Sequence, residues 1–178
     1  LALHPDIRRP IGGVKQMHRL AESLNRLGRD ARIIQDKESF HPAWFRSNVS
    51  TVSKEEFKSC VELRSDRDVV ILPETFLPIL PRYAPGLPKI IFNQNGAYSF
   101  GFNERDGFPD PYEVLKLYHH PDLKHVLCIS KHDEVLLKHA FQLGNHHVTR
   151  LINGIETELF LPSKFKHRTI SYMSRKNT

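Results

Sequence analysis

Several short stretches of the chain carry groups that suit ligand chemistry, and the first two contain Gly12-Gly13 and Glu74. Gly12-Gly13 stand just before a helical pattern. Glycines let a backbone approach a ligand closely, and the first amides of a helix can bind an anion. Glu74 follows the apolar run 69–72. A carboxylate there suits a hydrogen bond with a substrate hydroxyl, and it would equally serve as the favourable negative charge at the start of the next helix.

Two further candidates follow later apolar runs. Asn93-Gln94-Asn95-Gly96 form an amide-rich stretch. The Asn95 side chain can donate and accept hydrogen bonds but cannot exchange a proton near neutral pH, so it suits binding better than general base catalysis. The same composition is typical of a simple turn. Ser130 stands before a strong helical pattern, where the role of an N-cap is a complete explanation of it.

The elements that must position these groups alternate between strands and helices, which is the pattern of a parallel sheet. Apolar runs predict strands at residues 1–3, 31–34, 68–72, 89–92, 125–129 and 148–152. Periodicity and capping residues predict helices at residues 14–27, 54–61, 111–119 and 131–143. Residues 36–52 lack periodicity and are predicted to be a long loop. The expected fold class is α/β, a Rossmann-like parallel sheet flanked by helices, with function concentrated at the carboxyl ends of the strands.

The last thirty residues predict the start of a second domain. A turn at Asn153-Gly154 leads into an acidic helical turn, a basic spacer and a further apolar strand at Thr169–Met173, which is followed by Arg175. We expect residues 1–162 to form one domain. Residues 163–178 would be a linker and the first strand of the next domain, so that the chain is truncated there, and its start at Leu1 indicates truncation at that end too.

This C-terminal stretch resembles the inter-domain crossing of the GT-B glycosyltransferases, in particular the retaining family four. The matching positions are Asn153-Gly154-Ile155-Glu156, Phe160-x-Pro162 and Ile170–Arg175. Their spacing over roughly twenty-five residues makes the resemblance specific, because Asn-Gly alone marks any turn. Glu156 and Ser174 depart from the family pattern, which has Asp and Gly at these positions.

The resemblance implies a fold, an activity and its partners. The chain would be the N-terminal, acceptor-side half of a GT-B fold, inactive by itself. The longer parent would transfer a sugar from a nucleotide-diphosphate sugar to a saccharide or lipid-linked acceptor, with retention of configuration and without a metal or other cofactor.

The resemblance also implies roles for individual residues. Gly12-Gly13 would lie against the donor diphosphate, and Arg175 would neutralise the departing pyrophosphate, a task that suits its fork of donors. Asn95 stands where family members carry a His that contacts the sugar. The resemblance implies that the leaving phosphate itself acts as the base, so an Asn, which does not titrate, need not abolish the reaction. The remaining candidates are Glu74 as a second catalytic residue and Ser130, Asn153 and Gly154 in the inter-domain cleft.

Composition narrows the partners and the location. The formal charge is +6, but the basic residues are spread without an aromatic-interleaved face, so nucleic acid is not expected. A cationic surface also suits anionic lipids or phosphorylated donors. No run of eighteen apolar residues is present, and the two cysteines, Cys60 and Cys128, are expected to be buried thiols. We therefore expect a cytoplasmic protein that can make peripheral contact with the inner face of the membrane.

Other classes of function remain open. The eleven histidines include no pair on one helix face beside a carboxylate, so a metal site is not expected. A GT-B sugar-nucleotide epimerase shares the architecture that the resemblance implies. The Asn at position 95 also leaves open a degenerate, non-catalytic Rossmann-like binding domain.

Overall fold

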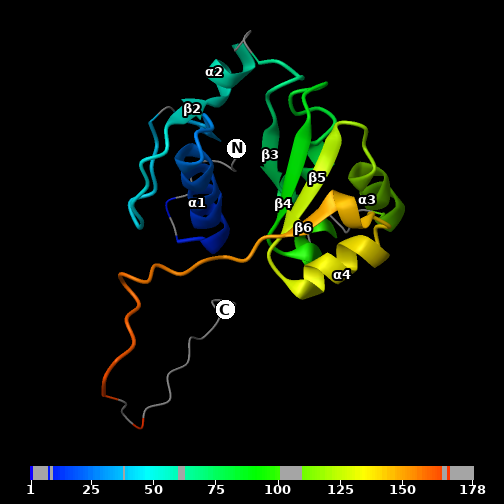
Figure 1. The fold of residues 1–178 in the computed structure, drawn as a ribbon. Coiled ribbons are helices and arrows are strands. Elements are labelled where there is room, and N and C mark those ends of the chain that lie inside the picture. Colours follow the sequence, from blue (N-terminus) through cyan, green and yellow to red (C-terminus); the bar gives the residue numbers. More distant parts are fainter. Residues whose placement is uncertain are drawn as a thin grey trace.

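The computed structural model describes residues 1, 8, 10–37, 39–59, 63–100, 110–165 and 168. Its strands form two parallel sheets flanked by helices, one with the strand order β3-β4-β5-β6 and a smaller one of β1 and β2 (Figure 1). The strands of the larger sheet are β3 (Val70–Pro73), β4 (Lys89–Asn93), β5 (Leu123–Cys128) and β6 (Val148–Arg150). The prediction of an α/β protein with parallel strands and flanking helices is confirmed.

The larger sheet forms from short apolar runs that are buried on both faces, as parallel strands usually are. Every residue of β3 is buried. In the register of the sheet, Ile71 lies opposite Ile90 and Ile91 lies opposite Val126. The four strands predicted for this part of the chain are confirmed, with ends displaced by one or two residues.

The smaller sheet pairs β1 (Ile33–Gln35) with β2 (Thr51–Ser53). The prediction that residues 36–52 are loop throughout is therefore wrong at their end. A three-residue strand is too short to show periodicity. β2 is a strand because it pairs with β1, which lies over fifteen residues away in the sequence. The described strands thus form two sheets where the sequence predicted one.

Leu1 lies beside β1. Its amino group donates to the Arg32 carbonyl oxygen at 2.7 Å, and its carbonyl accepts from the Ile34 N–H at 2.6 Å. This position agrees with the strand predicted at the start of the chain, whose other two residues lie outside the described ones.

The helices begin at the residues that the capping signals predict, except for the first. Asp110 accepts from the Tyr112 N–H at 2.9 Å, and Ser53 accepts from the Glu56 N–H at 3.0 Å. Gly28 ends the first helix with φ of +77°, a conformation that favours glycine. The α-helices are α1 (Gly12–Arg26), α2 (Lys54–Ser59), α3 (Pro111–Tyr118) and α4 (Lys131–His139), and the 3₁₀ helices are η1 (Glu74–Ile79), η2 (Gly96–Phe100) and η4 (Asn145–His147).

Helix α4 is four residues shorter than predicted. Its last helical residue is His139, and Gln142 adopts a positive φ of 54°. The apolar residues Phe141 and Leu143, which extended the predicted helix, instead turn into the core, where both are buried.

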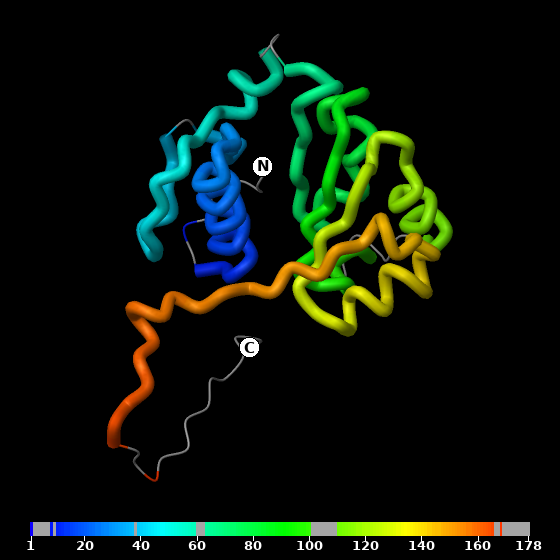
Figure 2. The backbone as a smooth tube through the Cα atoms, viewed as in Figure 1, coloured from blue at the N-terminus to red at the C-terminus, as the bar shows by residue number. Residues whose placement is uncertain are grey.

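The core lies on both faces of the larger sheet, because successive strand residues point to opposite sides. Leu72 and Ile91 belong to a cluster that includes residues of η1, α3 and α4. Ile71 and Phe92 belong to a second cluster with residues of α1 and β1. Figure 2 shows α1 and the smaller sheet on one side of the larger sheet and α3 and α4 on the other.

Cys128 is buried and free, as predicted, whereas Cys60 lies outside the described residues. In the described part of the chain, no helix combines the length and the apolar character needed to cross a membrane.

Candidate functional site

The carboxyl ends of β3 and β4 meet the start of α1. Glu74 follows β3 and is buried, and its Oε2 accepts from the Gln94 N–H at 3.1 Å. The side chain of Gln94 in turn donates through Nε2 to the Gly13 carbonyl oxygen at 3.2 Å. Two hydrogen bonds therefore join three segments that are far apart in the sequence. From the sequence, Gln94 was predicted only to be part of an amide-rich turn.

Burial raises the pKa of Glu74 to about 7. Backbone N–H groups, among them those of Gln94 and Asn95, favour the charged form and oppose this shift, and the negative charge of Asp133 adds to it. A carboxyl with this pKa changes its charge near neutral pH. The buried carboxyl of Glu74 thus holds the turn after β4, and its predicted contact with a substrate hydroxyl stays a prediction.

Asn95 forms the turn that leads into η2. Its Oδ1 accepts from the Ala97 N–H at 3.1 Å, and its carbonyl oxygen accepts from the Tyr98 N–H at 2.9 Å. This geometry is that of an Asx turn. The side chain is half-buried at the edge of the sheet where ligands are expected, with its oxygen already used by the chain.

Ser130 caps α4 as predicted. Its hydroxyl accepts from the Asp133 N–H at 3.0 Å and donates to Asp133 Oδ2 at 2.6 Å. The other carboxylate oxygen of Asp133 accepts from the Gly96 N–H at 3.0 Å, so that the cap also holds the turn after β4. Asp133 was not among the predicted site residues, although Ser130-x-x-Asp133 has the spacing of a capping pair.

Gly12 and Gly13 are the first two residues of α1, where the sequence predicted a loop preceding the helix. Gly13 is packed, since an added Cβ would lie 3.4 Å from Gln94 Nε2. Gly12 is exposed, and an added Cβ would meet nothing within 4 Å. Ile11 stands at the N-cap and offers no side-chain acceptor to the first amides of the helix.

Asn153 and Gly154 lie in the segment that follows β6 and passes near the start of α1 (Figure 1). Glu156, two residues further on, forms ion pairs with Lys15 and Arg19 of α1. Asn153 is half-buried and Gly154 is exposed. The segment therefore contacts the first two turns of α1 through Glu156. This residue was not among the predicted site residues.

Arg175 and the strand predicted at Thr169–Met173 lie outside the described residues. The predicted contact of Arg175 with the leaving diphosphate is therefore not described by the structure.

A buried polar network fixes the end of β4 behind this edge. Asn93 Nδ2 donates to Ser99 Oγ at 3.1 Å and to the Tyr118 hydroxyl at 2.9 Å, and these two hydroxyls are 2.8 Å apart. Burial raises the pKa of Tyr118 to about 12, so the phenol stays protonated at neutral pH. The network ties β4, η2 and α3 together.

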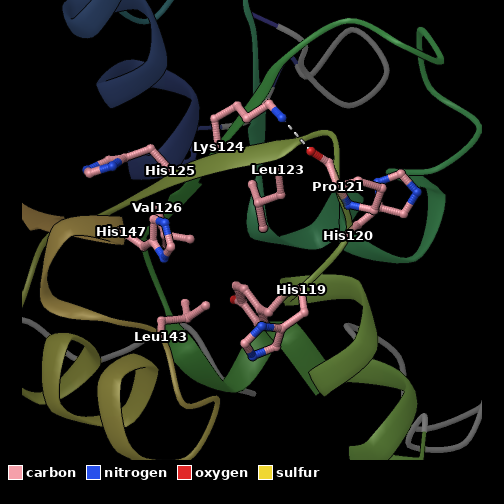
Figure 3. A pocket seen from close by; sticks show the side chains of 10 residues that line it. His119, His120, Pro121, Leu123, Lys124, His125, Val126, Leu143 and His147 are labelled. Atoms are coloured by element: carbon pink, nitrogen blue, oxygen red, sulfur yellow. Dashed lines mark hydrogen bonds between the residues drawn. The ribbon is translucent and has the colours of Figure 1, made fainter.

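Four histidines lie at the opposite edge of the sheet. A pocket of about 200 Å³ at the amino end of β5 is lined by His119, His120, His125 and His147 (Figure 3). The His119 ring nitrogen Nε2 lies 2.8 Å from the Phe141 carbonyl oxygen, and His125 Nε2 lies 2.9 Å from Thr149 Oγ1. Among the described residues, no three His, Cys, Asp or Glu side chains are arranged to hold a metal ion.

No family model matches the chain, and no curated protein matches its sequence significantly. What the structure supports is an α/β fold with parallel sheets, at whose carboxyl edge Glu74, Gln94 and Gly13 are joined.

Proposed function

We propose that the chain is the acceptor-side, Rossmann-like domain of a GT-B glycosyltransferase resembling the retaining family four. Its parent transfers a sugar from a nucleotide-diphosphate sugar to a saccharide or lipid-linked acceptor with retention of configuration. In this proposal residues 1–162 form the domain, and residues 163–178 lead into the domain that binds most of the donor.

The observation that carries the proposal is the open start of α1 at the carboxyl edge of the sheet. Gly12 has no positive φ, and no neighbouring atom would obstruct a side chain there. Neither the backbone conformation nor the packing therefore requires a glycine at this position. A ligand that must come close to the backbone supplies a reason, and the amides of a helix start favour a phosphate.

The neighbouring residues would act by holding this start in place. Gln94 fixes the Gly13 carbonyl, and Glu74 fixes the backbone of Gln94. Arg175 would add the charge that stabilises the leaving diphosphate. With the leaving phosphate as the base, the reaction needs no titrating side chain at Asn95.

The test is calorimetric titration of the parent protein with UDP-, GDP- and dTDP-sugars, using wild type and Gly12→Ala. One donor class should bind the wild type. In the variant, the added Cβ should keep the phosphate from approaching the backbone N–H. Loss of that one hydrogen bond to a charged phosphate should weaken donor binding by about tenfold or more. The melting temperature should not fall, because an alanine at this position fits without contact and favours the helix.

Gly28→Ala is the matched control. Gly28 lies at the other end of α1 with φ of +77°, so alanine there strains the backbone and lowers stability. Donor affinity should remain that of the wild type. Unchanged donor affinity in Gly12→Ala would refute a phosphate site at the start of α1.

One observation favours a second candidate, the non-catalytic binding domain. The side-chain oxygen of Asn95 is engaged in the turn by the Ala97 N–H, where a catalytic contact was expected. This candidate predicts that the parent binds a donor but neither transfers its sugar nor hydrolyses it. Product analysis after prolonged incubation with the donor that binds distinguishes the two.

A further inference from the structure

Two cations of α1 converge on a single carboxylate oxygen. Glu156 Oε1 lies 3.0 Å from Lys15 Nζ, and the same oxygen binds a guanidinium nitrogen of Arg19. Hydrogen bonds from Lys15 and Arg19 hold the pKa of Glu156 below its usual range. The oxygen therefore marks a point where α1 attracts negative charge.

The two cations lie on the same face of α1 as Gly12, the first residue of the helix. Gly12, Lys15 and Arg19 are spaced by three and four residues, which places them along one face of α1. Arg19 is also held by Glu22 at 2.7 Å, and this contact orients its guanidinium group. The side chains of Lys15 and Arg19 are 34% and 36% exposed, so a ligand can reach both from solvent.

The carboxylate of Glu156 can be displaced from Lys15 and Arg19 by an anion that binds these two cations more tightly. It belongs to residues 151–165, which contain no helix or strand. Exposed ion pairs stabilise a protein little, because water and salt screen them. A phosphate monoester carries more negative charge than a carboxylate and offers three oxygens, which suits a guanidinium and an ammonium together.

We propose that Lys15 and Arg19 form a binding site for the phosphoryl group of a small-molecule ligand, and that Glu156 occupies this site when the ligand is absent. Glu156 then acts as a latch that competes with the ligand, and binding releases residues 151–165 from α1. The phosphoryl group can belong to a nucleotide or to a phosphorylated sugar. Lys15 and Arg19 would bind the phosphoryl group whether or not the parent transfers a sugar.

The test is calorimetric titration of the 178-residue chain with inorganic phosphate, comparing wild type, Glu156→Gln and Glu158→Gln. Glu158 is exposed in the same segment, so its variant changes the net charge equally and serves as the matched control. If the latch is closed in about nine molecules of ten, Glu156→Gln should strengthen phosphate binding about tenfold. Glu158→Gln should leave it within about twofold of wild type, since screened charges act weakly at a distance.

Lys15→Met supplies the complementary arm. Introduced into Glu156→Gln, where the latch is already open, it should remove the gain in phosphate affinity and leave the circular dichroism spectrum unchanged. Repeating the titrations with UDP and with a hexose 6-phosphate identifies the source, because opening the latch strengthens both by the same factor and the true ligand class binds more tightly in both backgrounds. Equal affinities of Glu156→Gln and Glu158→Gln for all three probes would overturn the proposal. Loss of donor binding in Gly12→Ala without a latch effect would leave only the proposed function standing.

Discussion

Two buried groups should give the stability of this protein opposite dependences on pH. His18 of α1 is fully buried, with its Nδ1 3.0 Å from Ser47 Oγ and its ring edge-on to Phe45. Burial, together with the positive charge of His41, lowers its pKa to about 4. Burial raises the pKa of Glu74 to about 7.

The sign of each effect follows from which state holds the proton more tightly. For His18 the unfolded chain, with an ordinary pKa of 6.5, binds the proton better than the folded one. Stability is therefore lost as the pH falls from 6.5 to 4. For Glu74, whose ordinary value is 4.5, the folded protein binds the proton better, so stability is gained as the pH falls from 7 to 4.5. Each shift corresponds to at most about 3 kcal/mol.

Between pH 7 and pH 5 the two effects should nearly cancel. Each changes the free energy of unfolding by about 2 kcal/mol over this range, with opposite sign. His18→Gln should therefore become more stable by about 2 kcal/mol on acidification from pH 7 to pH 5, relative to the wild type's own change. Glu74→Gln should lose about as much over the same range.

The assay is urea unfolding at pH 7, 6 and 5, followed by the fluorescence of Trp44, the single tryptophan, which packs against Phe45. The compared quantity is the change with pH within each variant, since both substitutions can alter stability at pH 7. His132→Gln, on the exposed face of α4, is the control and should follow the wild type. If His18→Gln also follows the wild type, the buried histidine is not the group that titrates, and the reasoning fails.

Two further predictions concern packing and a buried charge. Gly96→Ala should lower the free energy of unfolding by about 1–3 kcal/mol, because the new Cβ would lie 2.7 Å from Leu136 Cδ2 and 2.9 Å from Asp133 Oδ1; thermal unfolding measures this. Asp122→Ala should cost about 3 kcal/mol in urea unfolding at pH 7, because it removes the carboxylate 2.8 Å from Lys89 Nζ, whose side chain is fully buried.

Each of these substitutions has a control in the same chain. Gly154→Ala adds a methyl group in open space and should change stability by less than about 0.5 kcal/mol. Asp66→Ala breaks an ion pair with Arg64 in which both side chains are more than 60% exposed, so its effect should be small. If Asp122→Ala lowers the free energy of unfolding no more than Asp66→Ala does, the burial of Lys89 does not make its ion pair with Asp122 more important for stability.

The sequence predicted those parts of the fold that depend on neighbouring residues. Asp110 and Ser130 mark helix starts because their side chains accept from amides two or three residues away. The apolar runs of β3 and β4 predict strands because burial on both faces needs apolar residues at successive positions. Such signals lie within a few residues, so a single sequence contains them.

Features that depend on distant partners were missed or misplaced. β2 is a strand because Thr51 lies opposite Ile33, and nothing within its own three residues indicates this. The predicted end of α4 was too late in the chain because Phe141 and Leu143 continue the helical apolar pattern. In the structure both residues pack in the core after the helix has ended. Gly12 and Gly13 were placed before the helix because its apolar spacing begins at Val14, whereas the structure includes both glycines in the first turn of the helix.

The candidate site shows why the strand ends could be predicted and their chemistry could not. The end of each strand could be predicted from the residues next to it in the sequence. The contacts of the site, however, join Gln94 to Gly13 across 81 residues and Glu156 to Arg19 across 137 residues. Gln94 binds Glu74 with its backbone and the start of α1 with its side chain. Since Glu74 changes its charge near pH 7, a proton lost there strengthens the hydrogen bond from Gln94, because a charged acceptor binds an N–H more tightly. The ionisation of one buried carboxyl is thus coupled, through a single glutamine, to the helix start at which we propose that a phosphate binds.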